Sequence, residues 1–283
     1  MPDPAIGWHP HLEVWLLFAA LLGGYAWALR RIGPRHVSPG EPPASRGQVT
    51  AFVLGIAAMW IAADWPVHEL AEERLFSVHM GQHLLLSLVG SPLLLLGTPG
   101  WLFRTLVRPR WLFAVVRNLS RPIPALLLFN GYIALSHWPP VVQLQVSSEP
   151  AHFLLHAVLV GTALLMWMPV LSPIAEIPRL RYPGQMLYLF AQSIVPTVPA
   201  SFLTFADTPL YPFYGAAAPL AGIDAVLDQR IAGLTMKLLG GLILWAAIAV
   251  LFFRWHAQEE ATGSDAPVWE DLERELHDLE TGR

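Results

Sequence analysis

The sequence contains no cysteine, and this absence excludes several kinds of chemistry. Without a thiol, the 283-residue chain forms no disulfide, no thiolate nucleophile and no thiolate metal site. A bound metal would have to be held by histidine, methionine, carboxylate or backbone oxygen. The sequence also lacks the HExxH pattern of zinc proteases, a phosphate-binding loop and a dinucleotide fingerprint, so we expect no enzyme.

Charge is scarce as well. Charged residues make up 13% of the chain and hydrophobic residues 54%, whereas soluble domains carry about 25% charged residues. Long apolar stretches with so few charges place a chain in a lipid bilayer. We therefore expect an all-α fold, a polytopic membrane helix bundle, with lipid around it and no nucleic acid as a partner.

Seven apolar stretches have roughly the 17–25 residues that cross the hydrocarbon core. They lie at 12–30, 48–63, 77–97, 122–138, 151–171, 185–206 and 229–253. The connections at 30–47, 104–121 and 172–184 are rich in arginine, and the opposite connections are not. Arginine-rich loops face the cytoplasm in membrane proteins, which predicts an N-terminus outside and a C-terminus inside.

Two regions differ in composition. Residues 1–256 form the expected transmembrane domain. Residues 257–283 hold nine acidic and two basic side chains. We expect this acidic tail to lie in the cytoplasm and to form a short amphipathic helix.

Histidines gather at the predicted outer end of the bundle. His79 and His83, and likewise His152 and His156, are four residues apart, which places both rings of a pair on one helix face. Ionisable groups within a membrane are costly and face the bundle interior or a cavity. The sequence therefore predicts an outward-facing metal site, although histidines bonded to backbone carbonyls at the membrane surface are an alternative. The expected ligands are His68, His79, Met80, His83, His137, His152 and His156.

The donor types narrow the choice of metal. Imidazole and thioether without thiolate favour copper or zinc over magnesium or calcium. We expect copper, as Cu(I) or Cu(II), with zinc as the less favoured ion. Cu(I) is favoured for transfer because both donor types suit it.

The stretch at 65–99, WPVHELAEERLFSVHMGQHLLLSLVGSPLLLLGTP, resembles the CtaG-type cytochrome c oxidase assembly factors, which are seven-helix bacterial membrane proteins. The HMxQH core of that family is matched by His79, Met80, Gln82 and His83. Further segments are similar in the same order. They are SHWPP at 136–140, the HxxxH helix at 151–171, ADTPLYPFY at 206–214 and DQRIAGLTM at 228–236.

The resemblance implies a membrane copper-binding factor that helps insert copper into haem–copper cytochrome c oxidase, without catalysis of its own. Its partners would be the catalytic subunit of the oxidase and a periplasmic copper donor. Its place would be the bacterial cytoplasmic membrane. We expect the client to contact the acidic tail or the outer loop that carries Tyr211 and Tyr214.

Lys237 falls within the last apolar stretch, where relatives are expected to carry an apolar or aromatic residue. A lysine at this depth needs a polar cavity or a partner on another helix. Asp228 lies on the same helix, too far along it to pair with Lys237. Lys237, Asp228, Met236 and Asp64 are further candidates for functional residues.

Three other functions stay open at this point. A retinal protein would use Lys237 for a Schiff base, but the sequence offers no obvious carboxylate at mid-membrane depth. A b-type haem protein would take axial histidines from 77–97 and 151–171. A His-box membrane metalloenzyme usually has adjacent histidines, which this sequence lacks.

Overall fold

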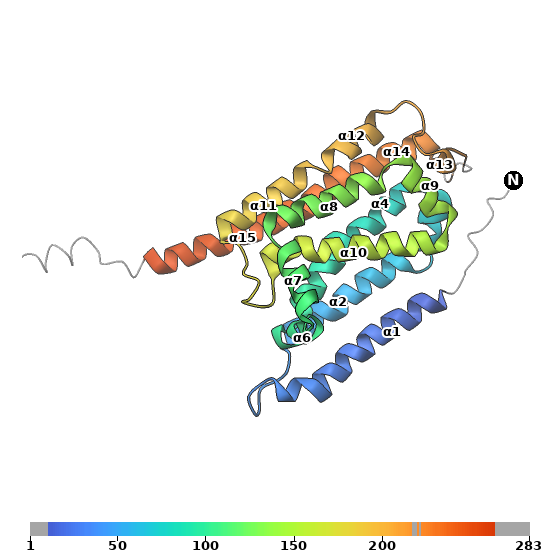
Figure 1. Cartoon of the computed structure of the whole chain (residues 1–283). Helices are drawn as coiled ribbons and strands as arrows, with labels where there is room; N and C mark the ends of the chain where they lie inside the picture. The colour runs from blue at the N-terminus through green and yellow to red at the C-terminus, as the bar shows by residue number, and fades with distance from the viewer. Residues whose placement is uncertain (1–10, 217–219, 221, 264–283) are drawn as a thin grey trace, which may run out of the picture.

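The computed structural model describes residues 11–216, 220 and 222–263, and its regular elements there are helices without a strand. Helices form because backbone groups in hydrocarbon must find hydrogen-bond partners within their own segment. The long helices run side by side as a bundle, with α1 at its edge (Figure 1). The acidic tail beyond residue 263 lies outside the described residues.

Six helical stretches are long and apolar enough to cross a membrane. They are Leu12–Arg35, Arg46–Ala63, Phe76–Gly97, Glu149–Leu171, Tyr182–Phe205 and Ala225–Ala261. The span expected at 122–138 is the 15-residue helix α8, Pro122–Ser136. It follows α7, Arg110–Leu119, after a bend of 82°, and the described chain has up to seven spans if this bent pair counts as one.

Several of these spans change helix type along their length. The elements are α1 Leu12–Trp27, η1 Ala28–Ile32, η2 Gly33–Arg35, α2 Arg46–Ala63, α3 Val67–Glu69, η3 Leu70–Arg74, α4 Phe76–Leu84, η4 Leu85–Gly90, α5 Ser91–Gly97, α6 Gly100–Leu106, α7, α8, α9 Pro139–Ser147, α10 Glu149–Leu171, α11 Tyr182–Ile194, α12 Thr197–Phe205, α13 Pro212–Ala216, α14 Ala225–Leu234, η5 Thr235–Leu239 and α15 Gly240–Gly263. The segments η1, η3, η4 and η5 are π-helical. Such π turns are often found at functional sites.

The two ends of the bundle carry different residues. Figure 1 shows α9 and α13 at one end and α6 and α7 at the other. The arginine-rich connections include α6 and α7, which carry Arg104, Arg110 and Arg117. The histidine pairs lie on α4 and α10, toward the end where α9 and α13 lie.

Polar side chains tie neighbouring helices together in the interior. The Gln82 amide on α4 donates to the Ala62 carbonyl on α2 at 2.6 Å. The Tyr132 hydroxyl on α8 donates to the Leu155 carbonyl on α10 at 2.6 Å. These bonds fix α4 and α10 against their neighbours.

A buried carboxylate from the far end of the chain caps α4. The residue before α4, Leu75, has no side chain that bonds to the first turn. Asp228 on α14 accepts hydrogen bonds from the backbone N–H groups of Phe76 (2.6 Å) and Ser77 (3.1 Å), and from the Ser77 hydroxyl. A carboxylate at a helix N-terminus satisfies free N–H groups and the positive end of the helix dipole. Asp228 therefore sets the position of the helix that carries His79 and His83.

Replacement of Asp228 tests how much this cap contributes to the stability of the fold. We expect Asp228→Ala to lower the free energy of unfolding by about 2 kcal/mol or more, because buried N–H groups lose a charged acceptor. Thermal unfolding of the purified protein in detergent measures the change. Asp207→Ala is the control. Asp207 is exposed and lies 3.5 Å from Arg230, and such a surface ion pair contributes little to stability. Equal midpoints for the two variants would contradict the prediction.

Candidate metal site

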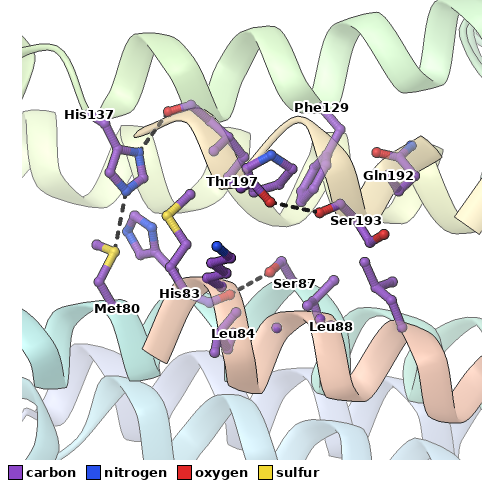
Figure 2. Close-up of a pocket in the computed structure, with 17 residues that line it drawn as sticks. Met80, His83, Leu84, Ser87, Leu88, Phe129, His137, Gln192, Ser193 and Thr197 are labelled. Carbon is purple, nitrogen blue, oxygen red and sulfur yellow. Dashed lines mark hydrogen bonds between the residues drawn. The ribbon is translucent and has the colours of Figure 1, made fainter. Parts of the chain in front are cut away.

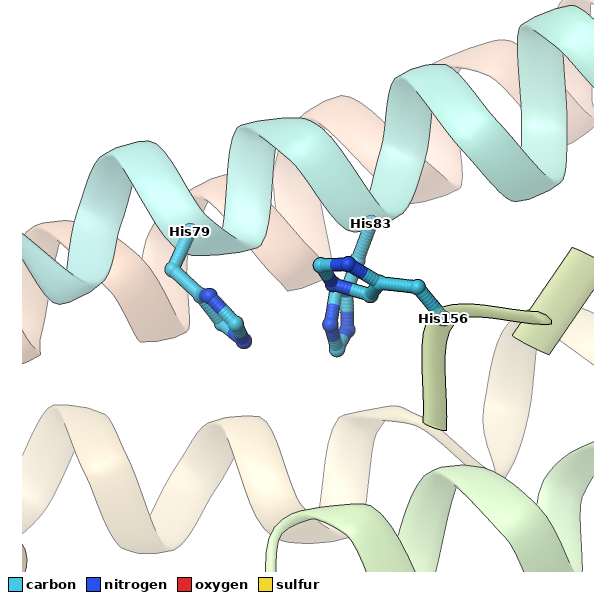
Figure 3. A group of neighbouring side chains, drawn as sticks. All are labelled: His79, His83 and His156. Atoms are coloured by element: carbon cyan, nitrogen blue, oxygen red, sulfur yellow. The ribbon is translucent and has the colours of Figure 1, made fainter. Parts of the chain in front are cut away.

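Three imidazoles meet between α4 and α10. His79 and His83 lie one turn apart on α4, and His156 faces them from α10 (Figure 3). One nitrogen from each ring lies within 4.8 Å of the others. The ring centroids are 4.5 Å apart for His79 and His83, and 5.3 Å apart for His83 and His156. We call these residues the three-histidine group.

The nitrogens of this group lack ordinary partners. Both nitrogens of His83, Nδ1 of His79 and Nε2 of His156 are buried and make no hydrogen bond within the described residues. An unsatisfied buried polar group costs roughly 1–3 kcal/mol, and native structures hold few of them. A metal ion bound to their lone pairs would remove much of this cost. Metal–nitrogen bonds of about 2.0 Å place tetrahedral ligand nitrogens about 3.3 Å apart, which falls within the 4.8 Å range that these nitrogens occupy.

Gln145 on α9 orients one of the rings. Its side-chain amide donates to Nε2 of His79 at 3.2 Å, and both residues are buried. A neutral imidazole carries one N–H and one lone pair. If the Gln145 amide is rotated by 180°, its oxygen takes the place of its nitrogen and accepts from Nε2–H of His79. In that orientation the lone pair of Nδ1 is left for a metal. This is the usual contact by which a neighbour fixes a metal-binding histidine.

His68, Glu72 and His152 form a second group nearer the end of the bundle. We call it the outer group. Glu72 Oε1 on η3 lies 3.1 Å from His68 Nε2 and 2.7 Å from His152 Nε2. The ring of His152 is 4.2 Å from that of His156, so the outer group contacts the three-histidine group. Burial lowers the pKa of His68, which keeps the ring neutral at pH 7 and able to act as a ligand.

His137 and Met80 lie on the other side of His83. His137 donates from Nδ1 to the Ile133 carbonyl at 2.7 Å, so Nε2 carries the lone pair. That nitrogen is 3.2 Å from the sulfur of Met80. The His83 and His137 ring centroids are 6.2 Å apart. The expected ligands thus fall into three neighbouring places, with His68 next to His152 and His137 next to His83.

A pocket with a volume of about 50 Å³ adjoins this site. Met80, His83 and His137 lie together at one side of it (Figure 2), and Thr197 and Lys237 are also among its lining residues. Lys237 lies on η5 and makes no hydrogen bond or ion pair within the described part of the chain. Lys237 lines this pocket and is itself exposed, and its role stays a prediction.

With the geometry in hand, the chain can be compared with known families. The family model described as cytochrome c oxidase caa3 assembly factor (Caa3_CtaG) matches residues 23–258. The chain belongs to this family. No curated protein and no solved structure gives a significant match. The match spans every helix that carries a residue of the candidate site. Family membership makes the oxidase the target and favours a non-catalytic assembly role over the haem, His-box and retinal alternatives.

The remaining candidates in the assembly factor have other tasks. Met236 lines the pocket beside Lys237. Asp228 caps α4, as described above. Asp64, just after α2, accepts hydrogen bonds from the indoles of Trp15 (2.8 Å) and Trp60 (2.7 Å) and so joins α1 to α2. The two carboxylates thus hold helices in place and lie outside the candidate metal groups.

The outer loop of the assembly factor carries two buried tyrosines. Tyr211 and Tyr214, which lie in the loop expected to contact the client, have 4% and 5% of their surface exposed. The Tyr211 hydroxyl donates to the His137 carbonyl and the Tyr214 hydroxyl donates to the Ala71 carbonyl. These rings pack into the bundle beside the site, and the contact of the loop with the client stays a prediction.

The structure also adds residues that sequence reasoning missed. Glu72 belongs to the outer group, and its spacing of four from His68 would have indicated it. Gln145 contacts His79 from α9, and no sequence pattern indicates this contact.

A further histidine–carboxylate pair lies outside both histidine groups. His11 donates to Glu69 at 3.0 Å. Burial lowers the pKa of His11, but hydrogen bonds with Glu69 and Glu13 outweigh burial and raise it.

The contact between Gln145 and His79 is testable. We expect Gln145→Ala to weaken binding of a transition-metal ion by about 10–100-fold, because His79 loses the group that orients it. Titration of the purified protein with Co(II), followed by absorption, measures the affinity. Gln143→Ala is the matched control, since Gln143 is exposed on the same helix. Equal affinities for both variants would show that Gln145 does not orient a ligand.

Proposed function

We propose that this assembly factor binds copper at His79, His83 and His156 and supplies it to the catalytic subunit of a haem–copper oxidase. The observation that carries the proposal is the set of buried imidazole nitrogens without partners in the three-histidine group. Imidazole donors without thiolate suit copper, with zinc second. The assembly role comes from the family, and the identity of the metal is our inference.

The arrangement suits a carrier. Three imidazoles leave coordination positions open, so a ligand of the client can approach the ion before the carrier releases it. Met80 and His137 offer further soft donors beside His83. The copper is cargo in this scheme, and the chain performs no covalent step.

The proposal includes a side of the membrane. The histidines lie at the end of the bundle opposite the arginine-bearing α6 and α7. Under the positive-inside rule, that end faces away from the cytoplasm. A periplasmic donor would then load the site across the outer surface of a bacterial cytoplasmic membrane.

Copper binding by the purified protein tests the site. We expect the double variant His83→Ala, His156→Ala to lose copper from the three-histidine group while the protein stays monodisperse, because two of three ligands are gone. Elemental analysis after equilibrium dialysis gives the copper content. His36→Ala with His256→Ala is the control, because those two histidines lie outside both histidine groups. Unchanged copper in the first variant would refute the assignment.

Deletion of the gene tests the role in the cell. We expect the deletion strain to make an oxidase that lacks active-site copper. Added copper should restore part of the activity, because mass action can replace a carrier. The copper content of the oxidase purified from copper-limited cells is the decisive measurement. Full occupancy there would refute the assembly role through copper.

A further inference from the structure

The outer group is separate from the site proposed above, and it has the features of a metal site itself. We infer that His68, Glu72 and His152 form a second metal site, which takes up Cu(II) at the outer surface and passes it to the three-histidine group. The second step rests on the proposed function. The existence of the outer site does not.

Glu72 makes close ion-pair contacts with both imidazoles of the outer group. Glu72 Oε1 lies 2.7 Å from His152 Nε2 and 3.1 Å from His68 Nε2. Nδ1 of His152 is buried and has no hydrogen-bond partner among the described residues. His152 itself has 6% of its surface exposed. One carboxylate oxygen and two imidazole nitrogens about 3 Å apart are spaced as ligands of one metal ion are, so an ion could take the place of the proton that the pairs share.

The donor types select the ion. One carboxylate and two imidazoles form a harder set than three imidazoles, and a carboxylate favours a divalent ion over Cu(I). The carboxylate also supplies negative charge to a cation that leaves water. Cu(II) therefore fits the outer group.

The relative burial of the two groups gives an order of filling. The side chains of His68 and Glu72 are 22% and 27% exposed. His79 and His83 are 4% and 5% exposed. An ion that arrives from water therefore reaches the outer group first.

His152 connects the two groups. It lies one turn before His156 on α10, with ring centroids 4.2 Å apart, and its ring is 6.2 Å from that of His79. An ion can pass inward by ligand exchange. Its bonds to Glu72 oxygen and His68 nitrogen break as bonds to the nitrogens of the three-histidine group form. The oxidation state does not change in this step, so no reductant is required.

The experiment counts Cu(II) ions in the full-length protein purified in detergent. We expect two ions per chain in the unaltered protein and one in Glu72→Gln, by equilibrium dialysis against Cu(II) alone. Glu73→Gln is the matched control, because it removes the same charge from the adjacent exposed residue, and it should keep two. His68→Ala is a second variant that should keep one, and it guards against a folding defect specific to Glu72→Gln.

The outcomes separate this inference from the proposed function. The double variant His83→Ala, His156→Ala should keep one ion, at the outer group. If it keeps two, the three-histidine site is wrong, and the variants at Glu72 and His68 still decide the outer site. If Glu72→Gln and His68→Ala bind as many ions as Glu73→Gln, Glu72 only pairs with its histidines and the outer site is overturned. One ion in the unaltered protein that Glu72→Gln and His68→Ala retain would overturn it too.

The rate of loading tests the order of filling. In rapid mixing with less than one equivalent of Cu(II), we expect Glu72→Gln to fill the three-histidine group at least about tenfold more slowly than Glu73→Gln. The final occupancy of that group should be the same in both. Equal rates would overturn the role of the outer site in uptake.

Discussion

The hydrogen bonds from the first turn of α4 to Asp228 hold the candidate site together. Without them, backbone N–H groups of Phe76 and Ser77 would be left unpaired in an apolar interior, where no water replaces a lost acceptor. The bonds also join α4 to α14, about 150 residues further along the chain. Because His79 and His83 follow within two turns, their position relative to α10 depends on this one buried carboxylate.

Much of the fold could be predicted from composition. Apolar stretches indicated the helices that cross the membrane, because length and hydropathy are local properties of the chain. The exception is the stretch at 122–138. Hydropathy does not register the bend of 82° between α7 and α8, which Pro122 at the start of α8 accompanies. The spacing of His79 and His83, and of His152 and His156, correctly placed each pair on one helix face, because that spacing is also local.

The division of the histidines into two groups could not be predicted in this way. It depends on which helix brings a polar atom to which ring. Glu72 reaches His152 from a π turn, and Gln145 reaches His79 from α9, contacts that depend on tertiary packing. The burial of Tyr211 has the same origin, since its hydroxyl finds the His137 carbonyl only after α8 and the outer loop have packed together.

Buried imidazole nitrogens without partners bear on how the three-histidine group would hold an ion. The rings offer nitrogens within 4.8 Å of one another, a range that includes the roughly 3.3 Å between ligand nitrogens of a tetrahedral metal. A bound metal would give these nitrogens the partners that the described residues do not, so part of its binding free energy would come from relief of that cost. Three imidazoles would fill three of the four tetrahedral positions. The fourth position would stay open to an outside ligand, and an open position favours transfer of an ion over its storage.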